Sequence, residues 1–185
     1  VMTPGMKATR DIALLTVGMA GGFRRSELGA MLVEDLRFVP DGGVVIRLRR
    51  SKKDQEGRGH ERKLSPGQFA HTCPVQALRV WLASSQIKSG PLFRGVSRHG
   101  KVYDTGRGLN GRSVDKIIRA RTRAAGLTGH FSGHSLRAGC INALAPMRTQ
   151  MQVQKHVDHA SAESTARYFR TVEIEMSNIT KDIGL

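Results

Sequence analysis

Apolar residues at helical spacing mark the segment from Lys7 to Ala20. Ile12, Leu15 and Met19 recur at the interval expected for one side of a helix. The pair Gly21-Gly22 follows, and glycine just after the last periodic residue is a typical helix stop. The pattern therefore predicts one helix that ends at this pair.

A short helix and a β-hairpin are predicted next. The segment 26–32 begins with Ser and Glu, which favour a helix start, and continues with apolar residues. The runs 36–39 and 44–48 are separated by Asp41-Gly42-Gly43, a strong turn signal. We expect two antiparallel strands joined by this turn.

The second strand of the hairpin alternates between apolar and basic residues. Its apolar side chains point to one side, while Arg47 and Arg49 point to the other. One face should therefore pack on a core and the other should be basic. A polar loop over 51–59 leads to a weaker strand at 60–64.

Helical patterns dominate the rest of the chain. The segment from Gly95 to Gly111 is rich in Gly and Arg and indicates a mobile loop. The fold class expected is α+β, a mainly α-helical single domain with a small three-stranded antiparallel sheet. The later helices are expected at 74–85, 113–125, 134–145 and 148–157, with a short helix around Tyr168.

Charge narrows the class of partner. Thirty Lys and Arg against fifteen Asp and Glu leave a net charge of +15, a typical signature of a polyanion partner. The charge recurs in 47–63, in 112–123 and around Arg137, which favours double-stranded DNA over an anionic membrane surface. No apolar run approaches the roughly 20 residues of a membrane span.

The cellular compartment follows from the cysteines and the first residues. Cys73 and Cys140 lie far apart with no CxxC spacing, so neither a disulfide framework nor a zinc ribbon is indicated. The chain opens without the apolar region of a signal peptide. A cytoplasmic, DNA-associated protein is expected. The first residue, Val1, is not Met, which suggests a fragment of a longer protein.

Three short segments carry cations suited to phosphate. Arg24 lies at the mouth of a helix, where backbone N–H groups and a guanidinium would jointly hold a phosphate; the plainer interpretation is a surface arginine. Lys52 and Lys53 lie in the loop after a basic strand, where a solvated charge run is the alternative. His134 and Arg137 stand at i and i+3, on one helix face.

A metal site and a base-stacking surface are the alternatives for the remaining residues. His130 and His134 would be a metal pair, but the HExxH glutamate and a carboxylate third ligand are missing, so no metal is expected. His159 and Tyr168 stand nine residues apart near the C-terminus. With 5% aromatic residues, a surface that stacks bases is poorly supported.

Taken in order, these segments resemble the tyrosine recombinase, or phage integrase, family. That family's pattern runs arginine, hairpin lysine, His-x-x-Arg, histidine or tryptophan, and a tyrosine near the C-terminus. The resemblance extends from about Lys7 to Arg170, and all six positions are filled. The matching residues are Arg24 in the G-x-R-x-S-E-L context, Lys52, His134 and Arg137 in the H-x-L-R box, His159, and Tyr168.

The resemblance implies a mechanism that needs no cofactor. Tyr168 would attack a DNA phosphate and form a 3′-phosphotyrosyl link, while Arg24 and Arg137 would neutralise the phosphate oxygens. His159 would donate a hydrogen bond to the same phosphate. His134 would serve as base or proton relay, and Lys52, or its rival Lys53, would protonate the departing 5′ oxygen.

The resemblance also predicts the domain organisation and partners. Residues 1–170 would form the catalytic domain, and the tail 171–185 would pack in cis or on a neighbouring protomer. The family's N-terminal core-binding domain is expected in the full-length protein. A monomer in solution would become a homo-tetramer on paired sites. The remaining DNA-binding candidates, beside Arg47, Arg49 and Lys53, are Arg112 and Lys116.

Two departures and three rival functions accompany this interpretation. Asp158 stands where the family normally has glycine, and 146–154 lacks the usual glycine-containing turn. A type IB topoisomerase would share the same chemistry and relax supercoils. A non-catalytic DNA-binding regulator would keep the scaffold without the reaction, and a metal-dependent nuclease would be sensitive to EDTA.

Overall fold

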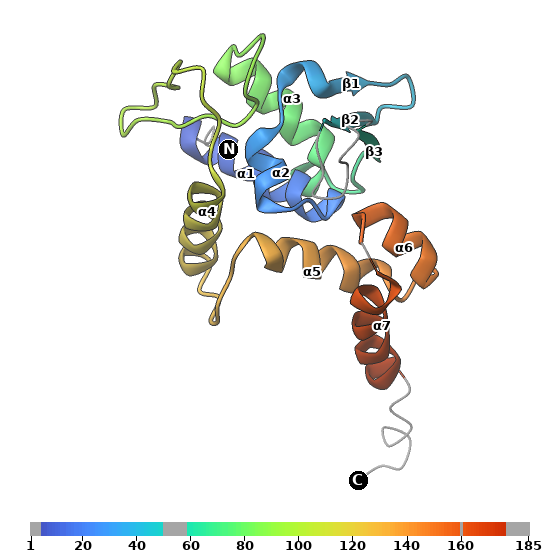
Figure 1. Cartoon of the computed structure of the whole chain (residues 1–185). Coiled ribbons are helices and arrows are strands. Elements are labelled where there is room, and N and C mark those ends of the chain that lie inside the picture. The colour runs from blue at the N-terminus through green and yellow to red at the C-terminus, as the bar shows by residue number, and fades with distance from the viewer. Residues whose placement is uncertain (1–4, 50–58, 160, 177–185) are drawn as a thin grey trace.

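The computed structural model describes residues 5–49, 59–159 and 161–176, and the side chains of 171–176 are not described. The expected fold class is confirmed: the domain is mainly helical with a small antiparallel sheet (Figure 1). In chain order the elements are α1 (Met6–Gly21), α2 (Arg25–Ala30), the 3₁₀ turn η1 (Val33–Asp35), β1 (Leu36–Phe38), β2 (Val44–Leu48), β3 (His60–Leu64), the 3₁₀ turn η2 (Ala70–Thr72), α3 (Pro74–Ser85), α4 (Gly111–Ala124), α5 (Gly133–Leu144), α6 (Gln150–Val157) and α7 (Ala162–Met176).

The sheet has the strand order β1-β2-β3, and both pairs are antiparallel. The predicted hairpin is confirmed, with Phe38 opposite Val44 and a turn in which Gly42 adopts a φ of 81°. Glycine suits that turn because it adopts positive φ without a steric penalty. On β2, Arg47 is exposed as expected, but Val45 on the same side of the strand is buried. The second face of the sheet is therefore only partly basic.

Helix α1 forms where predicted, but its buried side differs from the one its spacing suggested. Ile12 and Met19 are each 39% exposed, whereas Leu14 and Val17 are completely buried. The reason is that α1 packs against α3 and α5 together, so its buried face is set by two neighbours. The helix ends at Gly21, and Gly22 follows in the left-handed region with φ 58°, which confirms the predicted stop.

Two apolar clusters divide the interior. The larger contains the completely buried Trp81, whose indole N–H donates to the carbonyl of Leu92 at 2.9 Å. The smaller, around Ile141 and Val157, joins α5 to α6 and receives Tyr168 from α7. The helix that bears Tyr168 is thus seated on its own small core.

The segment from Gly95 to Gly111 has more structure than the mobile loop that its composition predicts. The Tyr103 N–H donates to the Gly95 carbonyl at 2.9 Å, and the Leu109 N–H donates to the Phe93 carbonyl at 2.9 Å. Val96 and Val102 form an isolated antiparallel bridge. Backbone hydrogen bonds therefore fix both ends of this segment.

The last helix, α7, extends away from the sheet, whereas α6 lies beside β3. Figure 1 shows α5 running from α4 toward α6, with α7 projecting from the end of α5. Helix α7 is longer than the short helix predicted around Tyr168 and continues past residue 170, where the tail was expected to begin. The rest of that tail, 177–185, lies outside the described residues. Among the helices described, none is long and apolar enough to cross a membrane.

Candidate active site

Arg24 is held at the start of α2 by a glutamate one turn later. Glu27 accepts a hydrogen bond from the Arg24 backbone N–H at 2.8 Å and another from its Nη1 at 2.5 Å. The Arg24 N–H is therefore already satisfied and is not open to a phosphate. Burial alone would lower the pKa of Arg24, but the hydrogen bonds and charges of Glu27 and Asp158 outweigh it, and the pKa is raised.

Arg137 points inward from α5 and is only 4% exposed. It donates from Nη1 to the Gly22 carbonyl at 2.8 Å and from Nε to His159 Nε2 at 3.2 Å. Burial and the neighbouring positive charge of Arg24 lower its pKa to about 10, so the group is still a cation at neutral pH. A desolvated guanidinium of this kind attracts an anion strongly.

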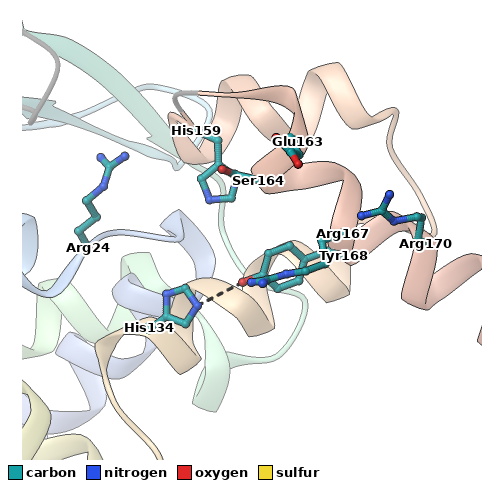
Figure 2. Close-up of a pocket in the computed structure, with 8 residues that line it drawn as sticks. All are labelled: Arg24, His134, His159, Glu163, Ser164, Arg167, Tyr168 and Arg170. Atoms are coloured by element: carbon teal, nitrogen blue, oxygen red, sulfur yellow. Dashed lines mark hydrogen bonds between the residues drawn. The ribbon is translucent and has the colours of Figure 1, made fainter.

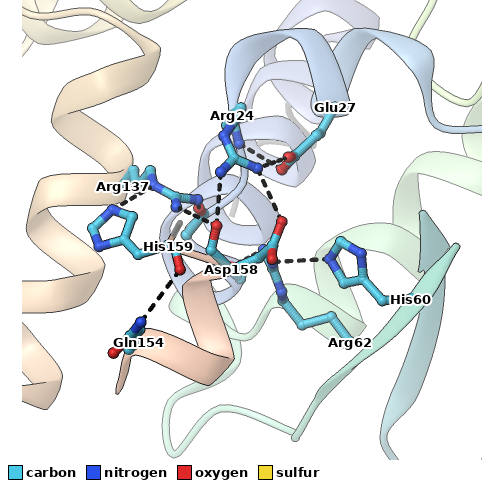
Figure 3. Close-up of polar contacts among 10 residues, drawn as sticks. Arg24, Glu27, His60, Arg62, Arg137, Gln154, Asp158 and His159 are labelled. Atoms are coloured by element: carbon cyan, nitrogen blue, oxygen red, sulfur yellow. Dashed lines mark hydrogen bonds and ion pairs between the residues drawn. The ribbon is translucent and has the colours of Figure 1, made fainter. Parts of the chain in front are cut away.

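The backbone carbonyl of Asp158 brings the two arginines together. It accepts from Arg24 Nη2 at 2.7 Å and from Arg137 Nη2 at 3.4 Å, as Figure 3 shows. Asp158 caps α6 in the left-handed conformation, with φ 55° and ψ 54°. Glycine, which the resemblance leads us to expect at this position, adopts this conformation without penalty, and aspartate is among the residues that tolerate it.

The Asp158 side chain adds a negative charge to the same place. Its Oδ2 lies 3.3 Å from Arg24 Nη1, and the two side chains are 26% and 29% exposed. Glu27, 4% exposed, pairs with the same nitrogen. Arg24 thus faces two carboxylates, of which that of Asp158 is the more exposed.

His159 lies between α6 and α7 and is bonded at both ring nitrogens. Besides the contact of Nε2 with Arg137, its Nδ1 lies 2.8 Å from Thr165 Oγ1. Burial, followed by the positive charges of Arg137 and Arg24, lowers its pKa to about 4. The imidazole is therefore neutral at pH 7.

Tyr168 and His134 face each other across the gap between α7 and α5, as Figure 2 shows. The Tyr168 hydroxyl lies 3.3 Å from His134 Nε2. His134 is exposed near the N-terminus of α5, whereas Arg137 is buried one turn later. The pair predicted to share a helix face therefore has separate partners: His134 contacts the phenol, and Arg137 contacts the Gly22 and Asp158 carbonyls and His159.

An open pocket joins these groups. Arg24, His134, His159 and Tyr168 all line it, and α7 contributes further cations at its rim (Figure 2). A second pocket beside it is lined by Arg24, His134 and Arg137 together with the N-terminal turns of α2 and α5. The structure thus brings five of the six predicted residues to one place, although they come from 24 to 168 in the sequence.

The predicted lysine and the DNA-binding candidates lie outside the pocket residues or outside the described part of the chain. Lys52 and Lys53 lie outside the described residues. Arg112 and Lys116 are exposed one turn apart on α4. Arg49 forms an ion pair, in which its Nε donates to Asp35 Oδ1 at 2.6 Å.

Sequence reasoning missed several residues that build the site. Thr165 is completely buried against His159, and nothing in its local sequence signals that contact. Asp115 of α4 is buried, accepts from the Gly133 N–H at 2.9 Å and pairs with Arg25. The role of Glu27 is visible in the spacing, because an acidic residue at the third helical position is typical of a capping box.

Comparison with known proteins places these residues in context. A family model described as the phage integrase family matches residues 2–173. An integrase/recombinase xerD homolog of Selenomonas ruminantium is 38% identical over 182 residues, which is 97% of this chain and 51% of that protein. The chain thus spans about half the length of this curated relative.

Solved structures share the fold at lower identity. XerH site-specific recombinase, crystallised with a palindromic difH substrate in a post-cleavage complex, matches with a TM-score of 0.72 and 16% identity, over 98% of this chain and 48% of that chain. XerA recombinase matches with a TM-score of 0.64 and 22% identity, over 91% of this chain and 55% of that chain. At these identities the likeness concerns the fold.

Proposed function

This chain belongs to the phage integrase family, and from that premise we propose that it is the strand-cleaving and rejoining domain of a site-specific DNA recombinase. One observation carries the proposal. Two guanidinium groups from distant parts of the sequence, Arg24 and Arg137, meet at one carbonyl beside a pocket that Tyr168 also lines. XerH site-specific recombinase, whose structures resemble this fold, was crystallised bound to its difH substrate, which supports DNA as the partner.

The proposed role of the two arginines is to neutralise one phosphodiester. A phosphodiester repels nucleophiles because its non-bridging oxygens carry negative charge, and fixed cations remove that repulsion. Guanidinium stays charged and offers a rigid fork of donors that fits phosphate oxygens. Arg24 and Arg137 each use donors on the Asp158 carbonyl now, and a phosphate would take hydrogen bonds from the same face.

Tyr168 is the proposed nucleophile. Its phenolic oxygen would attack phosphorus, form a phosphotyrosyl ester on the 3′ side and expel the 5′ oxygen as a hydroxyl. A phenol is mostly neutral at pH 7, so a base must take its proton as the bond forms. The contact of His134 Nε2 with the hydroxyl, at 3.3 Å, supports His134 as that base or as a relay to water.

Rejoining would run the same steps in reverse. A 5′-hydroxyl attacks the phosphotyrosyl ester, the tyrosine leaves as a phenol, and the ester linkage is conserved, so no nucleotide is consumed. Lys52, or its neighbour Lys53, is the proposed acid for the 5′ oxygen. We also propose the four-protomer assembly and the additional N-terminal domain for the full-length protein.

The test is formation of a covalent protein–DNA adduct. The chain is incubated in EDTA with nicked suicide duplexes from its native locus, and the products are separated on a denaturing gel. Tyr168→Phe should abolish the adduct and leave DNA binding nearly unchanged. Tyr103→Phe is the matched control, since Tyr103 is the other of the two tyrosines in the chain and is 49% exposed.

Each outcome separates the rival functions. An adduct at Tyr168 with a free 5′-hydroxyl supports the proposal, and exchange between two duplexes distinguishes a recombinase from a topoisomerase-like relaxing activity. DNA binding without any adduct would favour a regulator on the same scaffold. Cleavage that EDTA stops would overturn the proposal in favour of a metal-dependent nuclease.

A further inference from the structure

The hydrogen bonds of His159 define which ring nitrogen carries the proton. A guanidinium nitrogen can only donate, so the contact from Arg137 Nε makes Nε2 an acceptor. The ring is neutral at pH 7, and its proton is therefore on Nδ1, which donates to Thr165 Oγ1 at 2.8 Å. In this state Nε2 has no hydrogen to offer a phosphate.

The role proposed for His159 in the reaction requires the other tautomer. To donate a hydrogen bond to a phosphate oxygen, the ring must carry its hydrogen on Nε2, and Nδ1 must then accept. One proton leaves Nδ1 for water and one binds Nε2 from water, so the charge of the ring does not change. This exchange is possible only if Arg137 Nε turns away from Nε2 and Nδ1 still has a partner.

A hydroxyl is the group that can serve both tautomers. It rotates to accept from Nδ1–H or to donate to a bare Nδ1, whereas a carbonyl can only accept and an amide N–H can only donate. Thr165 is completely buried, so water does not easily take its place beside the ring. A buried nitrogen without a partner would be costly.

Thr165 also lies three residues before Tyr168 on the same helix. Residues at this spacing lie on one side of a helix, one turn apart. The contact between Thr165 and His159 therefore ties the helix that bears the nucleophile to a residue of the phosphate site. The hydroxyl of the neighbouring Ser164 is exposed and pairs instead with Ser161 Oγ at 2.9 Å.

We propose that Thr165 is a positioning residue that holds the His159 ring and allows it to change from the Nδ1–H to the Nε2–H tautomer when phosphate binds. The inference rests on the proposed function for the identity of the ligand. It does not rest on it for the tautomer of the free protein, which depends only on the contacts of His159 with Arg137 and Thr165.

Two substitutions separate the hydroxyl from the rest of the side chain. Thr165→Val keeps the shape and removes the hydroxyl, while Thr165→Ser keeps the hydroxyl and removes the methyl group. Thr165→Ala is a second hydroxyl-free variant for use if the valine variant does not fold. Thermal unfolding by circular dichroism checks that each variant is native.

The first readout is the ¹⁵N spectrum of the histidine rings in the free protein, because ¹⁵N shifts distinguish the two tautomers. Arg137 Nε still donates to Nε2 in each variant, so the wild type, Thr165→Ser and Thr165→Val should all show His159 as Nδ1–H. The Nδ1 signal should move only in Thr165→Val, where its hydrogen bond to Oγ1 is lost. The second readout is the rate of adduct formation on the nicked suicide duplex. It should fall about tenfold in Thr165→Val, the effect of one lost hydrogen bond, with little change in Thr165→Ser or in DNA affinity.

The outcomes are distinct from those of the proposed function. If Thr165→Val keeps the wild-type Nδ1 signal and rate, or if Thr165→Ser is as slow as Thr165→Val, Thr165 only fills space and the inference is wrong. If the wild type forms no adduct, the proposed function fails. The ring spectra still decide in that case whether the Thr165 hydroxyl accepts a hydrogen bond from His159 Nδ1.

Discussion

Removing the negative charge of Asp158 should strengthen DNA binding. Its carboxylate lies 3.3 Å from Arg24 Nη1, where a DNA phosphate is expected to bind, and aspartate here departs from the glycine usual in the family. Asp158→Asn removes the charge and keeps a residue that tolerates the left-handed conformation. Asp158→Gly removes the charge and also relieves the backbone.

The magnitude follows from the exposure of the pair. An ion pair between side chains that are 29% and 26% exposed is screened by water, and such pairs contribute about 0.2–1 kcal/mol. Phosphate binding must disrupt this pair and then bear a repulsion of similar size from the carboxylate. Together these effects amount to about 0.4–2 kcal/mol, or roughly 2- to 30-fold in the dissociation constant.

The two variants should agree in affinity, and neither should change stability much. A non-glycine residue in the left-handed region costs about 1 kcal/mol, so Asp158→Gly gains about that much in the folded state. Glycine also gives the unfolded chain more freedom, which costs about 0.4–1 kcal/mol. The net change in the free energy of unfolding should therefore be within about 1 kcal/mol for Asp158→Gly.

The assay is fluorescence anisotropy of a labelled duplex at a fixed salt concentration, with urea unfolding in parallel. Asp104→Asn is the matched control. It changes the net charge by the same amount, and Asp104 likewise pairs with an arginine, Arg94, but its side chain is 87% exposed. If both Asp158 variants bind DNA as Asp104→Asn does, the Asp158 carboxylate does not compete with phosphate for Arg24. If Asp158→Gly alone binds more tightly, the backbone and not the charge limits binding.

Further predictions concern the stability of the site. Arg137→Lys should lower the free energy of unfolding, measured in urea, by about 1–3 kcal/mol and abolish most adduct formation. One ammonium cannot replace the donors to the Gly22 carbonyl, the Asp158 carbonyl and His159. Full activity would contradict the role given to the guanidinium. The pKa of His159, lowered from 6.5 to about 4, predicts that the unfolded chain binds the proton first, so stability should fall as the pH drops from about 6.5 toward 4. In urea unfolding across that range, the free energy of unfolding should fall less in His159→Asn than in the wild type. Burial also lowers the pKa of His156, but that residue is present in both proteins and does not cause the difference. Identical pH dependence in the two proteins would refute the assignment to His159. Gly29→Ala should destabilise the fold by about 1–3 kcal/mol, because a Cβ there would lie 2.1 Å from the Leu109 carbonyl oxygen. Gly5→Ala is the control and should change thermal stability little, because the space around Gly5 is open. Equal effects of the two substitutions would show that the contact between α2 and Leu109 adapts.

The sequence by itself determined the elements and the list of reactive residues. Apolar periodicity predicted α3 at 74–85, and the Asp41-Gly42-Gly43 turn predicted the hairpin, because helices and turns depend on residues close in the chain. The spacing of His134 to Arg137 and of His159 to Tyr168 likewise lies within short segments. These local patterns were sufficient to indicate the family.

Only the tertiary structure decided how those residues meet. The buried side of α1 was mispredicted because two helices, α3 and α5, cover it, and no local pattern records which neighbours a helix will have. The hydrogen bond from Arg24 to the Asp158 carbonyl joins residues 134 positions apart, and it depends on the left-handed turn at the end of α6. The partnership of Thr165 with His159 depends in turn on how α7 packs against α5 and α6. Such contacts arise from packing between distant segments, which is why the sequence identified the reactive groups but not the network that orients them.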